Sequence, residues 1–310
     1  MAERVVLHVG LMKSGTSYLQ RRLGSAADPL AAAGVLFPGP EWRVQVDAVG
    51  DALGRGTGQE PMATGAWHRL VAEIDAHPGT AIVSMEWLTP SPAAKLARVV
   101  ESFPSSRVEA VVTVRDLGRT VPSMWQESLK NGRSHTFADY VTDVRRRAGR
   151  TSFWNEQDAG SVVAKWAGLV GVDATTVVTL PPPGADRELL WQRFCEAAGI
   201  DPAAAAPVPS SNESLSAEAA EVLRRVNLAL EPVGLSASDY SRLVKFPLAK
   251  GVLSARRPGE QAIGFRARRW VQALAREQQQ VIAATGVRIV GDLADLEARS
   301  VPGRLLRGAR

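Results

Sequence analysis

The sequence predicts an α/β fold, in which a P-loop-type parallel sheet of about five strands is flanked by helices, with helical additions in the C-terminal third. Short apolar runs rich in β-branched residues alternate with amphipathic helical patterns as far as about residue 200, and this alternation is typical of parallel sheets covered on both faces. The first run leads through a glycine-containing loop into a helix. With 310 residues, 45% of them hydrophobic, the chain is long enough to bury a large core.

The predicted strands and helices follow one another in the order that repeated strand–helix units require. Buried-strand runs occur at 4–9, 81–85, 108–114 and 175–180, with shorter candidates at 34–38 and 287–290. Helical patterns occur at 16–27, 66–77, 92–102, 121–130, 136–148, 158–170 and 186–199, and then at 216–231 and 260–284. We therefore expect a single domain over residues 1–310, with an α/β core at 1–200 and a mostly helical completion or lid at 201–310.

Residues 5–23, VVLHVGLMKSGTSYLQRRL, form the most informative segment of the chain. An apolar strand is followed by a loop that contains Gly10, Ser14 and Gly15, and a helical pattern begins at Thr16. Glycines let backbone N–H groups approach an anion, and the N-terminus of the helix adds about half a positive charge. The segment therefore predicts a phosphate-binding loop.

This loop differs from the nucleotide-triphosphatase pattern G-x-x-x-x-G-K-[ST]. Gly10 and Gly15 have the right separation, but Thr16 follows the second glycine, and the lysine is Lys13, inside the loop. No apolar strand ends in a convincing magnesium-binding aspartate, and the nearest candidate is Asp116. Such a loop suits a phosphate but is poorly equipped for a magnesium-bound triphosphate.

The segment from His8 to Gln20 resembles the 5′-phosphosulfate loop of sulfotransferases that use 3′-phosphoadenosine-5′-phosphosulfate (PAPS), whose usual form is close to h-x-G-x-x-K-[ST]-G-T-[ST]-x-L. The resemblance, which extends to bacterial sulfotransferase-like proteins, implies that the nucleotide-binding residues of this loop are Lys13, Ser14, Gly15, Thr16 and Ser17. The last three would hold the 5′-phosphate. Lys13 would also be catalytic, because it would neutralise the charge that develops on the bridging oxygen as PAP, the desulfated product, leaves.

A second segment, residues 107–130, tests this resemblance independently. Its apolar strand ends at Arg115, a turn follows, and Pro122 suits the first turn of the next helix, so Ser123 is expected near the helix start at the same sheet edge. Arg115 and Ser123 resemble the 3′-phosphate site of the family, which implies that the guanidinium and the hydroxyl bind that phosphate. The alternative is that Arg115 forms a surface ion pair.

Glu86 is the candidate catalytic base. It follows the apolar run 81–85, and the strand ends of doubly wound sheets line the ligand crevice. Its S-x-E context resembles that of bacterial sulfotransferases, in which this glutamate takes the proton of the acceptor hydroxyl. The animal cytosolic enzymes use a histidine near this position, but none occurs between His77 and His135. His135 is the rival base, and a surface or helix-capping role for Glu86 is the plainer alternative.

Composition excludes several other classes of protein. The formal net charge of +5 permits nucleic-acid binding, but basic residues do not interleave with aromatic ones, and an anionic coenzyme also needs cations. No apolar run approaches the roughly 20 residues of a membrane span. Cys195 is the only cysteine and the four histidines lack metal-site spacing. We therefore expect a cytoplasmic enzyme without a signal peptide, a disulfide or a bound metal.

The acceptor is the part of the reaction that the sequence leaves open. A hydroxyl or amine of a small molecule or carbohydrate is expected, with Trp87 and Trp125 as candidate pocket residues and the glycine-rich segment 50–65 as a mobile loop nearby. Lys250 is expected in a loop punctuated by proline and glycine within the most basic stretch, 242–269, which either folds over the coenzyme or forms a solvated face. The alternative functions are a P-loop small-molecule kinase and a non-catalytic nucleotide-binding protein, and the oligomeric state stays open.

Overall fold

The computed structural model describes the chain except residues 58–59, 62–63, 187, 210–213, 256–257 and 307–310. Contacts within the chain divide it into two compact units. The first, called here the sheet unit, comprises Met1–Arg115, Glu156–Ser210 and Glu277–Leu296. The second, the helical unit, comprises Asp116–Asn155, Ser211–Arg276 and Glu297–Arg310. Because the sheet unit includes residues beyond 276, the units do not follow the predicted boundary at residue 200, and the single domain stays a prediction.

The sheet unit is built on a parallel sheet that has six strands in the described part of the chain. Their order is β2 (Val35–Leu36), β5 (Thr80–Ser84), β1 (Arg4–Gly10), β6 (Arg107–Val114), β7 (Thr175–Thr179) and β8 (Arg288–Val290). The predicted α/β fold is confirmed, and both shorter candidate runs join the sheet, which gives one strand more than expected. In the register, His8 of β1 lies opposite Ser84 of β5, and Gly10 lies opposite Thr113 of β6.

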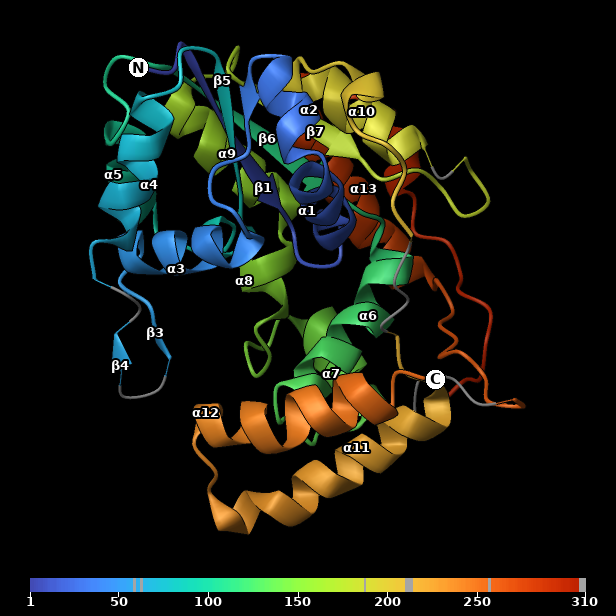
Figure 1. Ribbon diagram of the computed structural model, residues 1–310. Coiled ribbons are helices and arrows are strands. Elements are labelled where there is room, and N and C mark those ends of the chain that lie inside the picture. Colours follow the sequence, from blue (N-terminus) through green and yellow to red (C-terminus); the bar gives the residue numbers. More distant parts are fainter. Residues whose placement is uncertain (58–59, 62–63, 187, 210–213, 256–257, 307–310) are drawn as a thin grey trace. The chain divides into compact units, whose positions relative to one another are not determined.

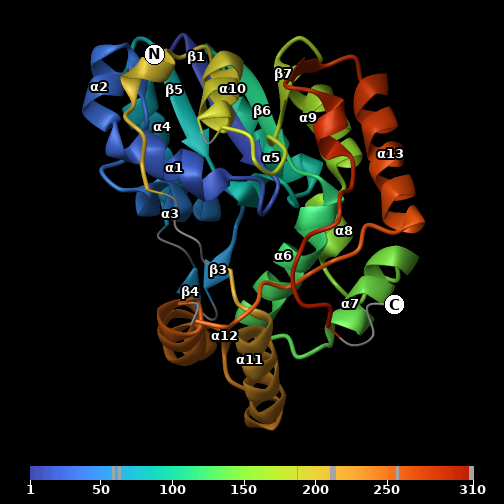
Figure 2. The same ribbon diagram turned by 90° about the vertical axis from the view of Figure 1, so that its right-hand side faces the viewer.

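Helices cover both faces of this sheet (Figures 1 and 2). Because side chains alternate along a strand, Val5, Leu7 and Val9 pack in one buried cluster and Val6 packs in another. The first cluster includes residues of α3 (Trp42–Ala52), α4 (Ala66–Asp75), α5 (Ala93–Glu101) and α9 (Ala159–Val170). The second includes residues of α1 (Thr16–Ser25), α2 (Ala27–Ala32) and α10 (Leu189–Ala198). The sheet is therefore buried on both sides, as its apolar strands require.

Short elements complete the sheet unit. They are the antiparallel pair β3 (Gly56–Thr57) and β4 (Glu60–Pro61), and the 3₁₀ turns η1 (Glu86–Leu88), η2 (Pro202–Ala204) and η5 (Leu293–Leu296). The glycine-rich segment 50–65 was predicted as a loop, but α3 extends into it as far as Ala52 and β3 follows. Part of that segment lies outside the described residues.

The helical unit contains α6 (Leu117–Lys130), α7 (Phe137–Arg146), α11 (Ala217–Leu230), the turn η3 (Glu231–Val233), α12 (Ala237–Tyr240) and a π-helical segment, η4 (Ser241–Val252). Two helices, α8 (Phe153–Gln157) and α13 (Arg269–Ala284), contribute residues to both units. The predicted helix at 260–284 begins only at Arg269, because Ile263 and Phe265 form isolated bridges to Arg304 and Val301. The basic segment around Lys250, predicted as a loop, is helical instead.

The start of α6 corrects another prediction. The helix begins at Leu117, because the Asp116 carboxylate accepts a hydrogen bond from the Arg119 backbone N–H (2.9 Å) and so caps it. Pro122 therefore lies inside the helix and not in its first turn. Ser123 follows it in the second turn, so the prediction that Ser123 lies near the helix start is wrong.

Among the described residues, no helix combines the length and apolar character that crossing a bilayer would require.

Candidate functional site

The loop between β1 and α1, residues 11–15, forms a tight turn that depends on the glycines at its two ends. Lys13 and Gly15 both adopt the left-handed conformation, with φ values of 67° and 88°. Gly10 is needed for close packing, because a Cβ there would lie 1.8 Å from Cγ2 of Thr16. Gly15 is needed twice over, for its positive φ and because a Cβ would lie 2.6 Å from Leu190 Cδ2.

Three side chains hold the carbonyl groups of this loop. Ser14 Oγ donates to the Leu11 carbonyl (2.6 Å), and Gln157 Nε2 donates to the Met12 carbonyl (2.9 Å). Arg115 Nη1 donates to the Lys13 carbonyl (3.0 Å). These three carbonyl groups are therefore bound within the sheet unit.

The N–H groups at the end of the loop are different. In the part of the chain that the structure describes, the backbone N–H groups of Gly15, Thr16 and Ser17 have no hydrogen-bond acceptor. They stand at the N-terminus of α1, where the first N–H groups of a helix lack intrahelical partners. With the loop carbonyls held and these donors open, the turn is suited to an anion such as a phosphate.

Arg115 and Glu86 lie on either side of this loop. β1 lies between β5 and β6 in a parallel sheet, so the carboxyl ends of all three strands meet at one edge. Arg115 directly follows β6, and Glu86 begins η1 two residues after β5. Both side chains are half-buried. The sheet thus brings Lys13, Arg115 and Glu86 to one edge, at the carboxyl ends of its strands, which is the edge at which open α/β sheets bind ligands.

Gln20 connects Glu86 to the loop helix, and sequence reasoning missed it. This buried amide on α1 donates from Nε2 to the Ser84 carbonyl (3.2 Å) and to the Glu86 carboxylate (3.3 Å). Gln45 of α3 accepts a hydrogen bond from the Ser84 N–H (2.8 Å), so the end of β5 is fixed from two helices. The available signal was a glutamine one turn after Thr16, on the apolar face of the helix.

Ser14 uses both of its donors inside the protein. Its N–H and its hydroxyl donate to the Leu11 carbonyl (3.0 and 2.6 Å), and its Oγ also contacts Thr113 Oγ1 (2.7 Å). The side chain is fully buried. Ser14 therefore shapes the loop through these bonds, whereas Thr16 and Ser17 contribute N–H groups that are open.

His8 is a second residue that sequence reasoning missed. Its Nδ1 lies 2.7 Å from Ser84 Oγ and its Nε2 lies 3.2 Å from Thr113 Oγ1. Phe194 of α10 packs edge-on against the ring at a centroid distance of 5.0 Å. Complete burial lowers the pKa of His8 to about 3, so the imidazole is neutral. The available signal was a polar residue inside each of three apolar strands.

Ser123 and His135 belong to the helical unit. Ser123 Oγ donates to the Arg119 carbonyl one turn back (2.8 Å). The imidazole of His135, the rival base, bonds through Nε2 to Ser128 Oγ (3.0 Å) and stacks on Tyr140. Its pKa is lowered, first by burial and then by the charge of Arg133.

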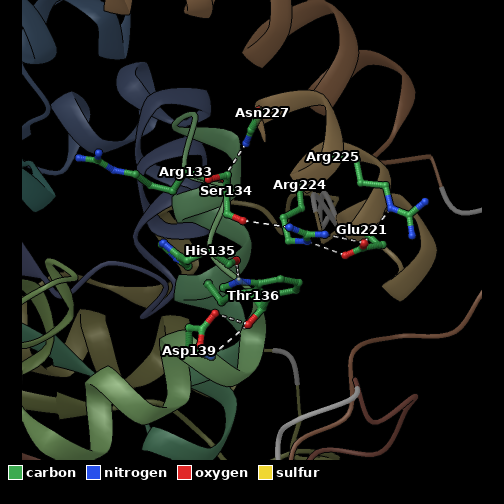
Figure 3. Close-up of polar contacts among 10 residues, drawn as sticks. Arg133, Ser134, His135, Thr136, Asp139, Glu221, Arg224, Arg225 and Asn227 are labelled. Carbon is green, nitrogen blue, oxygen red and sulfur yellow. Dashed lines mark hydrogen bonds and ion pairs between the residues drawn. The ribbon is translucent and has the colours of Figure 1, made fainter. Parts of the chain in front are cut away.

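The loop that carries His135 is fixed by α11 (Figure 3). Arg224 donates to the Ser134 carbonyl (3.2 Å), and Asn227 donates to the Arg133 carbonyl (2.7 Å). Trp125 Nε1 donates to the His135 carbonyl (3.1 Å), and Trp125 is only 1% exposed. The prediction that Trp125 lines a pocket is therefore wrong, because its indole belongs to the core of this unit.

Trp87, the other candidate pocket residue, is half-buried directly after Glu86. The guanidinium of Arg55 lies over its ring, 4.5 Å from the centroid. A cation over an indole face is a favourable contact. Trp87 therefore stays a candidate for contact with an acceptor.

Two further groups have structural roles that bear on the alternatives. Asp116, the candidate magnesium ligand, caps α6 and forms an ion pair with Arg119. Cys195 is buried, and burial raises the pKa of its thiol to about 12, so it is not a nucleophile at neutral pH. Within the described ranges, no three His, Cys, Asp or Glu side chains are grouped to hold a metal ion.

Comparisons with known proteins give one structural neighbour to report. No family model matches the sequence, and no curated protein matches it. A solved structure of a sulfotransferase from Alicyclobacillus acidocaldarius is similar to this chain with a TM-score of 0.44 and 17% sequence identity. The similarity covers 78% of this chain and 95% of that one.

Proposed function

We propose that the protein is a PAPS-dependent sulfotransferase, which transfers a sulfuryl group to a hydroxyl or amine of a small-molecule or carbohydrate acceptor. The observation that carries the proposal is the β1–α1 loop. Its N–H groups at Gly15, Thr16 and Ser17 are open, and it carries a lysine. It lies between a strand-end glutamate and a strand-end arginine.

The donors of the sheet unit fit an anionic nucleotide. The N–H groups of Gly15, Thr16 and Ser17 would hold the 5′-phosphate at the positive end of α1. Arg115 donates from Nη1 to the loop, and its guanidinium would bind the 3′-phosphate. Ser123 would assist only if its hydroxyl turned away from the Arg119 carbonyl.

The chemistry is a direct group transfer. The bond between sulfur and the acceptor oxygen or nitrogen forms as the bond between sulfur and the bridging oxygen breaks, and PAP leaves. Glu86 would take the acceptor proton, with its carboxylate oriented by Gln20. Lys13 would neutralise the charge on the bridging oxygen, so the rate would come from positioning and electrostatics.

Ligand binding tests the proposal first. Purified protein is heated with PAP, with ATP and Mg²⁺, or with AMP, because a ligand at 100 times its Kd stabilises the folded state by about 2.7 kcal/mol. We expect a clear rise in melting temperature with PAP and little change with the other two. A rise with ATP and Mg²⁺ alone would favour the kinase, and no rise with PAP would reject the proposal.

Two substitutions then separate binding from chemistry. Lys13→Ala should reduce transfer by about 100-fold to 1,000-fold, the usual effect of removing a group that stabilises transition-state charge. Glu86→Gln should keep PAP binding and lose transfer, whereas the exposed Glu41→Gln serves as the matched control. Full transfer by Glu86→Gln would shift the role of base to His135. If the wild type binds PAP but transfers the sulfuryl group to no acceptor, and Glu86→Gln binds PAP equally well, the protein is a non-catalytic binding protein.

A further inference from the structure

His8 is a buried, ionisable side chain that the proposed chemistry does not use. It lies on the face of the sheet that α1 and α10 cover, and none of its surface is exposed. The residues that contact it are Ser84 of β5, Thr113 of β6 and Phe194 of α10. None of the three carries a charge, so the polar contacts of His8 are to two hydroxyl groups.

The direction of the hydrogen bonds follows from the fixed acceptor at one end. Ser14 Oγ lies 2.6 Å from the Leu11 carbonyl, which only accepts, so the Ser14 proton is used there. Thr113 must then donate to Ser14 across 2.7 Å, and it must accept from His8 Nε2 across 3.2 Å.

The other ring nitrogen is assigned by the same reasoning. With the proton on Nε2, the Nδ1 of neutral His8 accepts from Ser84 Oγ at 2.7 Å. A proton on Nδ1 would make the imidazole a cation, and the Ser84 proton would have to turn to another acceptor. In the described part of the chain, Ser84 Oγ has no second partner.

We propose that His8 is a positioning residue for the β1–α1 loop. Its Nε2–H donates into a hydroxyl relay, defined here as His8, Thr113 and Ser14, and this relay holds the Leu11 carbonyl and with it the turn at Lys13 and Gly15. Gly10 allows the relay to form, because a Cβ there would lie 2.8 Å from Thr113 Oγ1. The ligand-binding consequence rests on the proposed function, but the shape of the loop does not.

Thr113 offers the sharpest substitution, since valine has the same shape without the hydroxyl. Thr113→Val leaves the His8 N–H and the Ser14 oxygen without a partner, whereas Thr113→Ser keeps the relay and loses only a methyl group. The probes are the amides of Leu11 and Ser14, which donate to Thr113 O and Leu11 O at 3.1 and 3.0 Å.

Hydrogen exchange of these amides is measured on the whole chain without ligand. Thr113→Val should exchange them about tenfold faster than the wild type, the change expected for one lost buried hydrogen bond. Amides of β7 (Thr175–Thr179) should keep their rates, and Thr113→Ser should behave as the wild type. Equal rates at Leu11 and Ser14 in Thr113→Val and the wild type would overturn the proposal.

Two further readouts separate positioning from a general loss of stability. The Kd for PAP should rise about tenfold in Thr113→Val and recover in Thr113→Ser, whereas a purely structural role would lower the melting temperature of Thr113→Val and leave Kd unchanged. Nitrogen chemical shifts of His8 in the wild type at neutral pH should report the Nε2–H tautomer, and the Nδ1–H tautomer would refute the relay. If the wild type does not bind PAP, the proposed function fails, and the exchange and tautomer results still decide the role of His8.

Discussion

Acidification from pH 7 to pH 5 should destabilise the protein through His8. Burial lowers the pKa of this imidazole from 6.5 to about 3, because no charged group contacts it to stabilise a cation. The folded state therefore stays neutral at pH 5, while the unfolded chain binds a proton. Since the unfolded state binds more protons, the free energy of unfolding falls as the pH falls from 6.5 towards 3.

The size of the effect at pH 5 depends mainly on the pKa of the histidine in the unfolded chain. Each pH unit below 6.5 costs about 1.4 kcal/mol, so the loss at pH 5 is about 2 kcal/mol. His8 contributes little protonation to the folded state at pH 5, because its pKa there is about 3. His135, whose pKa burial also lowers, acts in the same direction.

Urea unfolding of the wild type and of His8→Gln at pH 7 and pH 5 measures this loss. Glutamine fills much of the space of histidine and does not titrate, so His8→Gln should lose about 2 kcal/mol less than the wild type between the two pH values. His135 is present in both proteins and cancels. Equal losses in His8→Gln and the wild type would show that His8 is not buried as a neutral group.

The structure also predicts the effects of substitutions at Arg22 and Asp143 and the reactivity of Cys195. Arg22→Met should cost about 3 kcal/mol in urea unfolding, because the buried guanidinium donates twice to the Ala205 carbonyl (2.8 and 3.2 Å); a cost below 1 kcal/mol would contradict this. Asp143→Ala should cost about 2 kcal/mol, since this carboxylate accepts the N–H (2.9 Å) and hydroxyl (2.7 Å) of Thr151; Asp143→Asn, which keeps one oxygen, should lie between it and the wild type in thermal unfolding. Cys195, with a pKa of about 12, should react with a disulfide reagent at pH 8 about 1,000-fold more slowly in the folded protein than in urea, and equal rates would refute its burial.

The strands were predictable because each is a continuous apolar run whose burial on both faces leaves no other placement. The start of α6 was not, since the same sequence from Asp116 to Gly118 suits a turn as well as a capped helix. The choice depends on whether the aspartate side chain meets the Arg119 N–H. The end of α3 was missed for a similar reason. Gly50 suggested a loop, but it lies in the last turn of the helix and is buried there. Tertiary packing overrides local propensity at both places.

The residues of the candidate site also divide into those that the local sequence predicted and those that it did not. Lys13, Gly15 and Thr16 are neighbours in sequence, so their spacing alone predicted the loop. Gln157 and Thr113, by contrast, reach the loop from elements about 100 residues or more away. Their contribution depends on the register of parallel strands and on the placement of α8, and no local pattern encodes either. The polar residues within apolar strands were visible, but their mutual contact was not.

The loop motif is not sufficient by itself to form this turn, because side chains from elsewhere in the chain hold its carbonyl groups. Two of them depend on Arg115 and Gln157, which follow a different strand and end a different helix from those that flank the loop. A peptide or a grafted scaffold that carried only residues 5–23 would keep every letter of the motif, but its carbonyls would be free to turn inward and compete with an anion for the N–H groups. The turn that the motif forms is thus held by two strand ends and one helix end acting together, and a search for unrelated proteins with the same turn should require all three.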